Sequence, residues 1–315
     1  MAVEYGCYSP DDRFLAIAPM CHGAGMIFSL APIFFGGYAE IMDFFDPEIV
    51  LRTMNNENIT GFFGVPTHFH GIFSLEQSIL NNSKPHQLKS IISNAAALPQ
   101  QVKEQIIEHF GEGLLHETYG STEGGIISNL RPDDQLKKLQ CVGQAFPCTE
   151  IKTLTESGTI CEPNEIGELF STSPYLFNGY WKRPDETKEA LVDGWLTVGD
   201  MARQDEDGYL YIVDRKKDMV ISGGINIYPR EIEDVLYNHP NIEDVAVIGV
   251  PDEKWGESLK AFIVANNPGE LQSEDVLSFC EQNISKIKTP KMIEFIDTIP
   301  RNANGKVLKT TLRKD

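Results

Sequence analysis

The sequence predicts an α/β fold in its first third, a compact β segment in its middle and a small α+β domain at its end. Apolar runs alternate with amphipathic helical segments up to about residue 140, and short strands with closely spaced turns follow to residue 214. Helices and strands alternate again after residue 217. We therefore expect domains over residues 1–139, 140–216 and 217–315.

The first third supports the α/β assignment with four segments. "FLAIAPM" (14–20) and "ITGFFGVP" (59–66) are continuous apolar runs typical of buried strands. "DPEIVLRTMNNEN" (46–58) and "PQQVKEQIIEHFG" (99–111) have apolar residues at helical spacing, and each begins at a proline or an aspartate. Strands that alternate with helices in this way indicate a sheet covered by helices.

The middle and the end differ in texture. "EIKTLTESGTICEPNEIGELFSTS" (150–173) and "DEDGYLYIVD" (205–214) alternate apolar and polar residues around turn signals, which indicates antiparallel β structure. The last third predicts a helix from "YPREIEDVLYNHP", strands over 243–250 and "LKAFIVAN" (259–266), and a helix from "SEDVLSFCEQNI". The segment around Lys217 carries charges on both sides and no apolar stripe, so we expect an exposed hinge there.

Composition excludes several classes of protein. The 315 residues are 41% hydrophobic and 23% charged, as in a globular protein that can bury a sizeable core. The 46 acidic residues exceed the 27 basic ones, for a net charge of -19, and this charge would repel a polyanion. We expect no nucleic-acid partner.

Cysteine usage and hydropathy bear on the compartment. The six cysteines lie far apart without a CxxC pair, which favours free thiols in a reducing compartment. No apolar run reaches the roughly 18 to 20 residues of a membrane-spanning helix. We therefore expect a cytoplasmic protein without a transmembrane segment, and the sequence leaves a homo-oligomer open.

"YGSTEGG" (119–125) combines an aromatic residue, glycines, hydroxyls and one carboxylate. A glutamate faces a phosphate most readily through a divalent cation, so Glu123 beside Thr122 suggests magnesium-nucleotide chemistry. The alternative is a strand-to-helix turn in which Ser121 and Thr122 cap the backbone. This stretch alone does not decide between the two.

Three further stretches concentrate functional residue types, each with a plain structural alternative. Asp200 ends "GWLTVGD", where it can accept hydrogen bonds from a vicinal diol such as ribose or simply occupy a turn. Arg215 and the side-chain-poor loop 222–224 follow, as a ligand contact or an interdomain linker. Lys306 follows an Asn-Gly turn, from which it can reach another domain or remain solvated.

Six stretches in order resemble one family. They are "PMCHGAG", "YGSTEGG", "GELFSTSPYLFNGYW", "DGWLTVGD", "DRKKDMVISGGINIYPREIE" and "PRNANGK", and they extend from Pro19 to Lys306. In these stretches the chain closely resembles an AMP-forming acyl-CoA synthetase of the acyl-CoA ligase, adenylating-domain and luciferase superfamily. The resemblance implies part of a large adenylate-forming domain, with α/β and β subdomains, followed by a small mobile C-terminal domain.

The resemblance also implies site residues. Thr122 matches a threonine that contacts the α-phosphate, and Glu123 matches a glutamate that helps to bind Mg²⁺. Tyr119 is expected along the adenine. Asp200 and Arg215 match residues that contact the ribose.

The implied chemistry has two steps and three substrates: a fatty or aryl carboxylic acid, ATP and CoA. Lys306 matches the lysine that bridges carboxylate and phosphate while acyl-AMP and pyrophosphate form. The thiol of CoA then displaces AMP. Between the steps the C-terminal domain rotates about a hinge at Lys217, which brings Ser222, Gly223 and Gly224 beside the pantetheine.

Two departures qualify the resemblance. The family's Ser/Thr/Gly-rich phosphate loop should precede "PMCHGAG", and nothing before Pro19 resembles it. We therefore expect a fragment of a longer chain whose full turnover is impaired. In addition, "SNAAAL" (93–98) has Asn94 and Ala97 where the family usually has glycine and proline.

Histidines provide the remaining candidates. His22 matches a position beside the acyl and pantetheine tunnel, and His68 follows "GVPT" near the expected acyl pocket, although each also suits a structural role. "HFH" (68–70) lacks a zinc spacing.

Two functions remain open: an acyl-CoA synthetase, and a non-catalytic module that binds AMP, CoA or a partner chain.

Overall fold

The computed structural model describes residues 1–96, 98–267, 269–302 and 306–313. The chain forms two compact units. The first contains residues 1–152, 170–198 and 204–211, and the second contains residues 153–169, 199–203 and 212–315.

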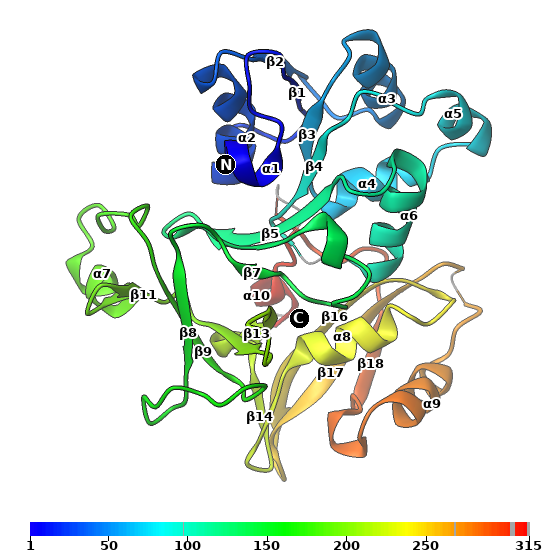
Figure 1. The fold of residues 1–315 in the computed structure, drawn as a ribbon. Coiled ribbons are helices and arrows are strands. Elements are labelled where there is room, and N and C mark those ends of the chain that lie inside the picture. Colours follow the sequence, from blue (N-terminus) through cyan, green and yellow to red (C-terminus); the bar gives the residue numbers. More distant parts are fainter. Residues whose placement is uncertain (97, 268, 303–305, 314–315) are drawn as a thin grey trace. The chain divides into compact units, whose positions relative to one another are not determined.

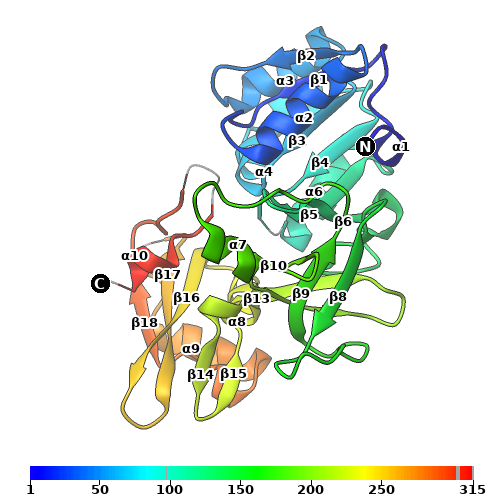
Figure 2. The same ribbon diagram turned by 90° about the vertical axis from the view of Figure 1, so that its left-hand side faces the viewer.

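The first unit is built on a seven-stranded sheet in the order β2-β1-β3-β4-β5-β6-β7. Strands β1 to β5 are parallel, whereas β6 and β7 are antiparallel to their neighbours. Figure 2 shows β2 at the outer end of this sheet. The strands are β1 (Arg13–Ala16), β2 (Tyr38–Ile41), β3 (Gly61–Gly64), β4 (Ser90–Ser93), β5 (Leu115–Ser121), β6 (Gly125–Leu130) and β7 (Gln144–Ala145).

Helices cover both faces of this sheet, because successive strand residues point to opposite sides. Leu15, Phe62 and Ile91 enter one core, and their neighbours Phe14, Phe63 and Ile92 enter the other. Figure 1 shows α2 on one side and α3, α4 and α6 on the other. The helices are α1 (Ala2–Tyr5), α2 (Gly23–Phe34), α3 (Pro47–Asn56), α4 (Pro66–Phe73), α5 (Gln77–Asn82) and α6 (Gln100–Phe110).

A second, six-stranded sheet has the order β10-β11-β9-β12-β13, with β8 paired to β9. The pairs β10–β11, β11–β9 and β9–β12 are antiparallel, as the turn-rich sequence predicts. The elements are β8 (Glu150–Leu154), β9 (Gly167–Thr172), α7 (Pro184–Ala190), β10 (Leu191–Val192), β11 (Trp195–Leu196), β12 (Asp200–Gln204) and β13 (Leu210–Arg215), and the 3-10 turns η1 (Pro132–Asp134) and η2 (Lys216–Asp218) flank this region.

The last part of the chain forms a third sheet, in the order β15-β14-β17-β16 with β18 beside β17. One face packs against α8 and α9 through Ile232, Leu236 and Val276, and the other packs against Ile299 and Leu312. The elements are β14 (Val220–Ser222), β15 (Ile225–Ile227), α8 (Pro229–Leu236), β16 (Ile242–Asp252), β17 (Gly256–Ala265), α9 (Ser273–Asn283), η3 (Lys286–Lys288), β18 (Met292–Phe295) and α10 (Lys309–Leu312).

The long amphipathic helices and the main strands confirm the sequence predictions, with boundaries shifted by a few residues. Among the elements that the sequence did not predict are α2, β4 and β18. Helix α2 is apolar nearly all round and contains Pro32, so it shows no amphipathic period, and the two strands have only four residues each.

The described part of the chain contains neither a membrane-spanning helix nor a disulfide bond. None of its helices has the length and apolar character needed to cross a bilayer. All six cysteines are free thiols, and Cys7, Cys141 and Cys280 are buried.

A buried ion pair ties α6 to β5. Lys103 is 1% exposed and pairs with Glu117, which also accepts a hydrogen bond from the Leu98 N–H at 3.2 Å. Removal of one partner leaves an uncompensated buried charge, which costs far more than the loss of an exposed pair.

Lys103→Met should lower the free energy of unfolding by about 3–5 kcal/mol in urea titrations, because Glu117 then stays buried without its cation. The control Lys137→Met removes an exposed pair with Asp134 at 3.7 Å and should cost no more than about 1 kcal/mol. Equal losses in the two variants would contradict a structural role for the buried pair.

Candidate functional site

"YGSTEGG" forms the turn of a β-hairpin between β5 and β6. The strand-to-helix turn considered from the sequence is therefore wrong, since the chain continues into an antiparallel strand. A Cβ on Gly120 would lie 2.0 Å from the Gly125 carbonyl oxygen, and Gly125 has φ +65°. Both positions therefore require glycine.

The hairpin turn presents its polar side chains in a fixed arrangement. The Ser121 hydroxyl accepts the Gly124 N–H at 3.0 Å, so Ser121 closes the turn, while Thr122 is exposed. Tyr119 is half-buried in β5. The hydroxyl that follows the turn-closing serine is therefore available to a ligand.

Glu123 is held by the loop that precedes α7. Its Oε1 accepts the Tyr180 hydroxyl at 2.8 Å, and its carbonyl oxygen accepts the Phe177 N–H at 2.8 Å. Burial, and then the bond to Glu123, raise the pKa of Tyr180 to about 12, so the phenol remains a donor. Among the described residues, Glu123 Oε2 has no hydrogen-bond partner. Tyr180 belongs to the stretch "NGYW", but no local sequence pattern predicts its bond to Glu123.

Asn94 joins the loop after β4 to β5. Its amide nitrogen donates to Thr118 Oγ1 at 2.7 Å, and its amide oxygen accepts the N–H of Ala95, which has φ +77°. The side chain therefore fixes the loop backbone. Ala97, the second departure from the family pattern, lies outside the described residues.

The two candidate pocket histidines differ in their surroundings. His68 Nδ1 accepts the Val65 N–H at 3.3 Å at the start of α4, and its ring stacks on Phe45 with centroids 4.6 Å apart. His22 precedes α2, and its buried Nε2 has no hydrogen-bond partner among the described residues. His68 is therefore engaged in local structure, whereas His22 retains a donor or acceptor.

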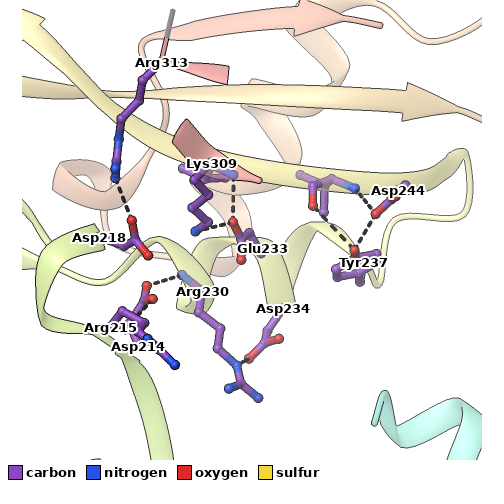
Figure 3. A network of polar contacts seen from close by, with 12 residues as sticks. Asp214, Arg215, Asp218, Arg230, Glu233, Asp234, Tyr237, Asp244, Lys309 and Arg313 are labelled. Atoms are coloured by element: carbon purple, nitrogen blue, oxygen red, sulfur yellow. Dashed lines mark hydrogen bonds and ion pairs between the residues drawn. The ribbon is translucent and has the colours of Figure 1, made fainter. Parts of the chain in front are cut away.

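In the second unit, Asp200 and Arg215 form an ion pair. Asp200 begins β12, Arg215 ends the neighbouring strand β13, and Arg215 Nε lies 2.7 Å from Asp200 Oδ1. Asp214 accepts the Arg215 N–H at 2.7 Å and the Arg230 N–H at 3.0 Å (Figure 3). These bonds fix the end of β13 against the start of α8.

Lys217 lies in the 3-10 turn η2 directly after β13. Gly223 and Gly224 form the two-residue turn between β14 and β15, with φ +58° and +81°, as a type I′ turn requires. A Cβ on Gly223 would lie 2.7 Å from the Trp255 ring, and Ser222 is buried. The Trp255 indole therefore occupies the space that a side chain at position 223 would need.

Lys306 is exposed and joins Asn302 through two bonds. Its N–H donates to Asn302 Oδ1 at 3.0 Å, and its carbonyl oxygen accepts the Asn302 N–H at 2.9 Å. Partial desolvation, and then the positive charge of Arg215, lower the pKa of the Lys306 ammonium, while Asp200 opposes the shift. Lys306, Arg215 and Asp200 belong to the same unit, and the charges of Arg215 and Asp200 act on the pKa of Lys306 in opposite directions. The Asn-Gly turn before Lys306 lies outside the described residues.

No cluster of three or more His, Cys, Asp or Glu side chains suited to a metal ion occurs among the residues that the structure describes.

The sequence profile of the AMP-binding enzyme family matches residues 1–181, and that of the AMP-binding enzyme C-terminal domain matches residues 231–306. The chain belongs to the AMP-binding enzyme family. The predicted resemblance is thereby confirmed.

Relatives of this AMP-binding enzyme include several CoA ligases. It is 36% identical over 309 residues to a feruloyl-CoA synthase of an Amycolatopsis species, covering 96% of this chain and 62% of the relative. It is 35% identical to a long-chain-fatty-acid–CoA ligase of Bacillus subtilis, covering 96% of this chain and 54% of the relative. The chain thus spans less than two thirds of these relatives.

Solved structures agree on the fold. ATP-bound MatB from Rhodopseudomonas palustris superposes with a TM-score of 0.91 at 30% identity, covering 99% of this chain and 61% of that one. The o-succinylbenzoate CoA synthetase MenE from Bacillus subtilis, in complex with its acyl-adenylate intermediate, gives 0.87 at 30% identity, covering 100% and 63%. The predicted fold class is confirmed.

Burial of His68 depresses its pKa to about 4, below the unfolded value near 6.5. The neutral ring stabilises the fold fully above pH 6.5, and this contribution is lost as the pH falls toward 4. His68→Gln should therefore reduce the loss of stability between pH 7 and 4 by up to about 3 kcal/mol in urea titrations.

The control is the same histidine-to-glutamine exchange at His86, whose side chain is exposed. A His68→Gln profile that is parallel to the wild-type profile would show that His68 is not held neutral.

Proposed function

We propose that this chain is an AMP-forming acyl-CoA synthetase, which joins a free carboxylic acid to CoA through an acyl-adenylate. Lys306 carries this proposal. Of the cationic side chains in segment 301–313, it alone has no carboxylate partner among the described residues. Its ammonium is therefore available for anions of the substrates, and it belongs to the same unit as the ion pair of Asp200 and Arg215.

The hairpin turn provides the proposed phosphate contacts. The exposed Thr122 hydroxyl would donate to the α-phosphate, and Tyr119 would lie along the adenine. Glu123 would hold Mg²⁺ through Oε2, because Tyr180 engages Oε1. When bound, the ion neutralises phosphate charge. The structure of MenE in complex with ATP and a magnesium ion supports the use of both by this chain.

The ribose contact is proposed for Asp200 and Arg215. A carboxylate accepts hydrogen bonds from both hydroxyls of a vicinal diol, and the ion pair with Arg215 orients the Asp200 carboxylate. Arg215 adds donors of its own toward the ribose.

The reaction then proceeds in two steps. A carboxylate oxygen of the acid attacks the α-phosphorus, the bond to the β-phosphate oxygen breaks, and pyrophosphate leaves while Lys306 stabilises the developing negative charge. The CoA sulfur, after loss of its proton, attacks the acyl carbonyl and AMP leaves. We propose that the small domain from residue 217 rotates about Lys217 between the steps, and that Ser222, Gly223 and Gly224 then contact the pantetheine.

The acyl group is proposed to lie near His22, His68 and Asn94. His22 has the unpartnered Nε2, whereas His68 and Asn94 would shape the wall through the bonds described above. The relatives' names refer to feruloyl, fatty-acid and 2-succinylbenzoate substrates, so both aryl and aliphatic acids are candidates.

The free thiols support a cytoplasmic location, which we propose for this enzyme.

A non-catalytic module that binds AMP or CoA is the alternative. Incubation with ATP, Mg²⁺ and a panel of aliphatic and aryl acids should release pyrophosphate and give a hydroxylamine-trappable acyl group, and CoA should convert it to a thioester detected by mass. Binding of AMP or CoA without either product would instead support the module.

Lys306→Ala should reduce acyl-AMP formation to background and leave thioester formation from supplied acyl-AMP intact. The physical reason is that the lysine charge is needed only while charge develops at the α-phosphate. Both half-reactions are to be measured separately by quenched-flow mass spectrometry. Equal loss of both would contradict this division of labour.

A further inference from the structure

The basic residues around Lys306 are each matched to a carboxylate of the same unit. Arg301 pairs with Asp244 at 2.7 Å, Lys309 with Glu233 at 2.8 Å and Arg313 with Asp218 at 2.8 Å. Figure 3 shows these carboxylates along α8 and its flanking segments. Lys306 lies between the first two pairs in the sequence and remains unpaired among the described residues.

The pair of Lys309 and Glu233 is the least exposed of the three, with side chains 13% and 15% exposed. Glu233 Oε1 also accepts the Val247 N–H at 2.8 Å. Val247 lies in β16, the edge strand of the third sheet, so a carboxylate replaces the missing neighbour strand at this N–H. One glutamate of α8 therefore connects β16 to the first residue of α10.

The chain around Lys306 is anchored on both sides. Arg301 and Val307 form an antiparallel bridge, and the Leu308 N–H donates to the Pro300 carbonyl at 2.8 Å. Ile299 and Leu312 are buried in the same core. A helix of four residues such as α10 is not stable by itself, so its position depends on these tertiary contacts.

We propose that Glu233 and Lys309 are positioning residues, which hold the start of α10 against α8 and thereby fix the Lys306 ammonium where the adenylation step needs it. This proposal rests on the function proposed above. Lys309 begins α10 three residues after Lys306, so displacement of Lys309 moves the backbone segment 306–308 that carries Lys306. Because Glu233 neutralises the charge of Lys309, Lys309 does not compete with Lys306 for substrate anions.

Three variants isolate the ion pair. Glu233→Gln removes the charge but keeps an oxygen for the Val247 N–H, and Lys309→Met keeps the aliphatic stem without the ammonium. Lys309→Arg retains the charge and is the rescue variant. The matched control is Glu231→Gln on the same helix, because Glu231 also pairs with a lysine, but this lysine is Lys288 at 2.7 Å in η3 and not a residue of α10.

The first readout does not depend on turnover. The pKa of Lys306, followed by NMR of isotopically dimethylated lysines and assigned with Lys306→Ala, should lie below the ordinary value of a lysine in the wild type, in Lys309→Arg and in Glu231→Gln. In Glu233→Gln and Lys309→Met it should rise toward the value of a solvated lysine, because the ammonium leaves the neighbourhood of Arg215. An unchanged Lys306 pKa in these two variants would overturn the proposal.

The second readout separates the half-reactions. Glu233→Gln and Lys309→Met should slow acyl-AMP formation by about 10- to 100-fold, while thioester formation from supplied acyl-AMP stays at the wild-type rate. A parallel loss of both steps would assign the pair to general stability and overturn the proposal. If wild-type protein forms no acyl-AMP, the proposed function fails, and the Lys306 pKa still decides whether the pair positions Lys306.

Discussion

The charge balance of the second unit is the constraint on which the account depends. Arg301, Lys309 and Arg313 each have a carboxylate partner, whereas Lys306 has none among the described residues. An ammonium without a partner keeps its Coulomb attraction for an incoming anion, and its lowered pKa reflects partial desolvation and the neighbouring Arg215. In the described part of segment 301–313, the surrounding ion pairs therefore hold the backbone and leave Lys306 as the one cation without a carboxylate partner.

In the first unit, the backbone geometry of the β5–β6 hairpin places the polar side chains of its turn. Gly120 and Gly125 permit a tight hairpin directly after the buried part of β5, and the turn presents Thr122 and Glu123. The ion pair of Lys103 and Glu117 joins α6 to β5, and Glu117 also accepts a hydrogen bond from the Leu98 N–H. The loop that carries Asn94 and the hairpin are thus supported by the same strand.

The sequence could predict the elements whose signals are local. Helices α3, α6, α8 and α9 have apolar residues at helical spacing, and the Gly223-Gly224 turn has the residues that its positive φ values require. Helix α2 lacked that spacing because both of its sides are apolar. The motif residues of the proposed nucleotide site were found through family resemblance, whereas Tyr180 and the pair of Glu233 and Lys309 were not. Their contacts join segments 57 and 76 positions apart in the sequence, and no local pattern encodes them.

The central claim is that Lys306 contacts the anions of the adenylation step. Residue-resolved labelling of lysines with an amine-reactive reagent, with and without ATP, Mg²⁺ and a carboxylic acid, tests it most directly. The account predicts that the substrates protect Lys306 strongly and leave Lys288 and Lys291, which are already paired with carboxylates, unaffected. Equal labelling of Lys306 in both conditions, while the nucleotide is bound, would contradict it.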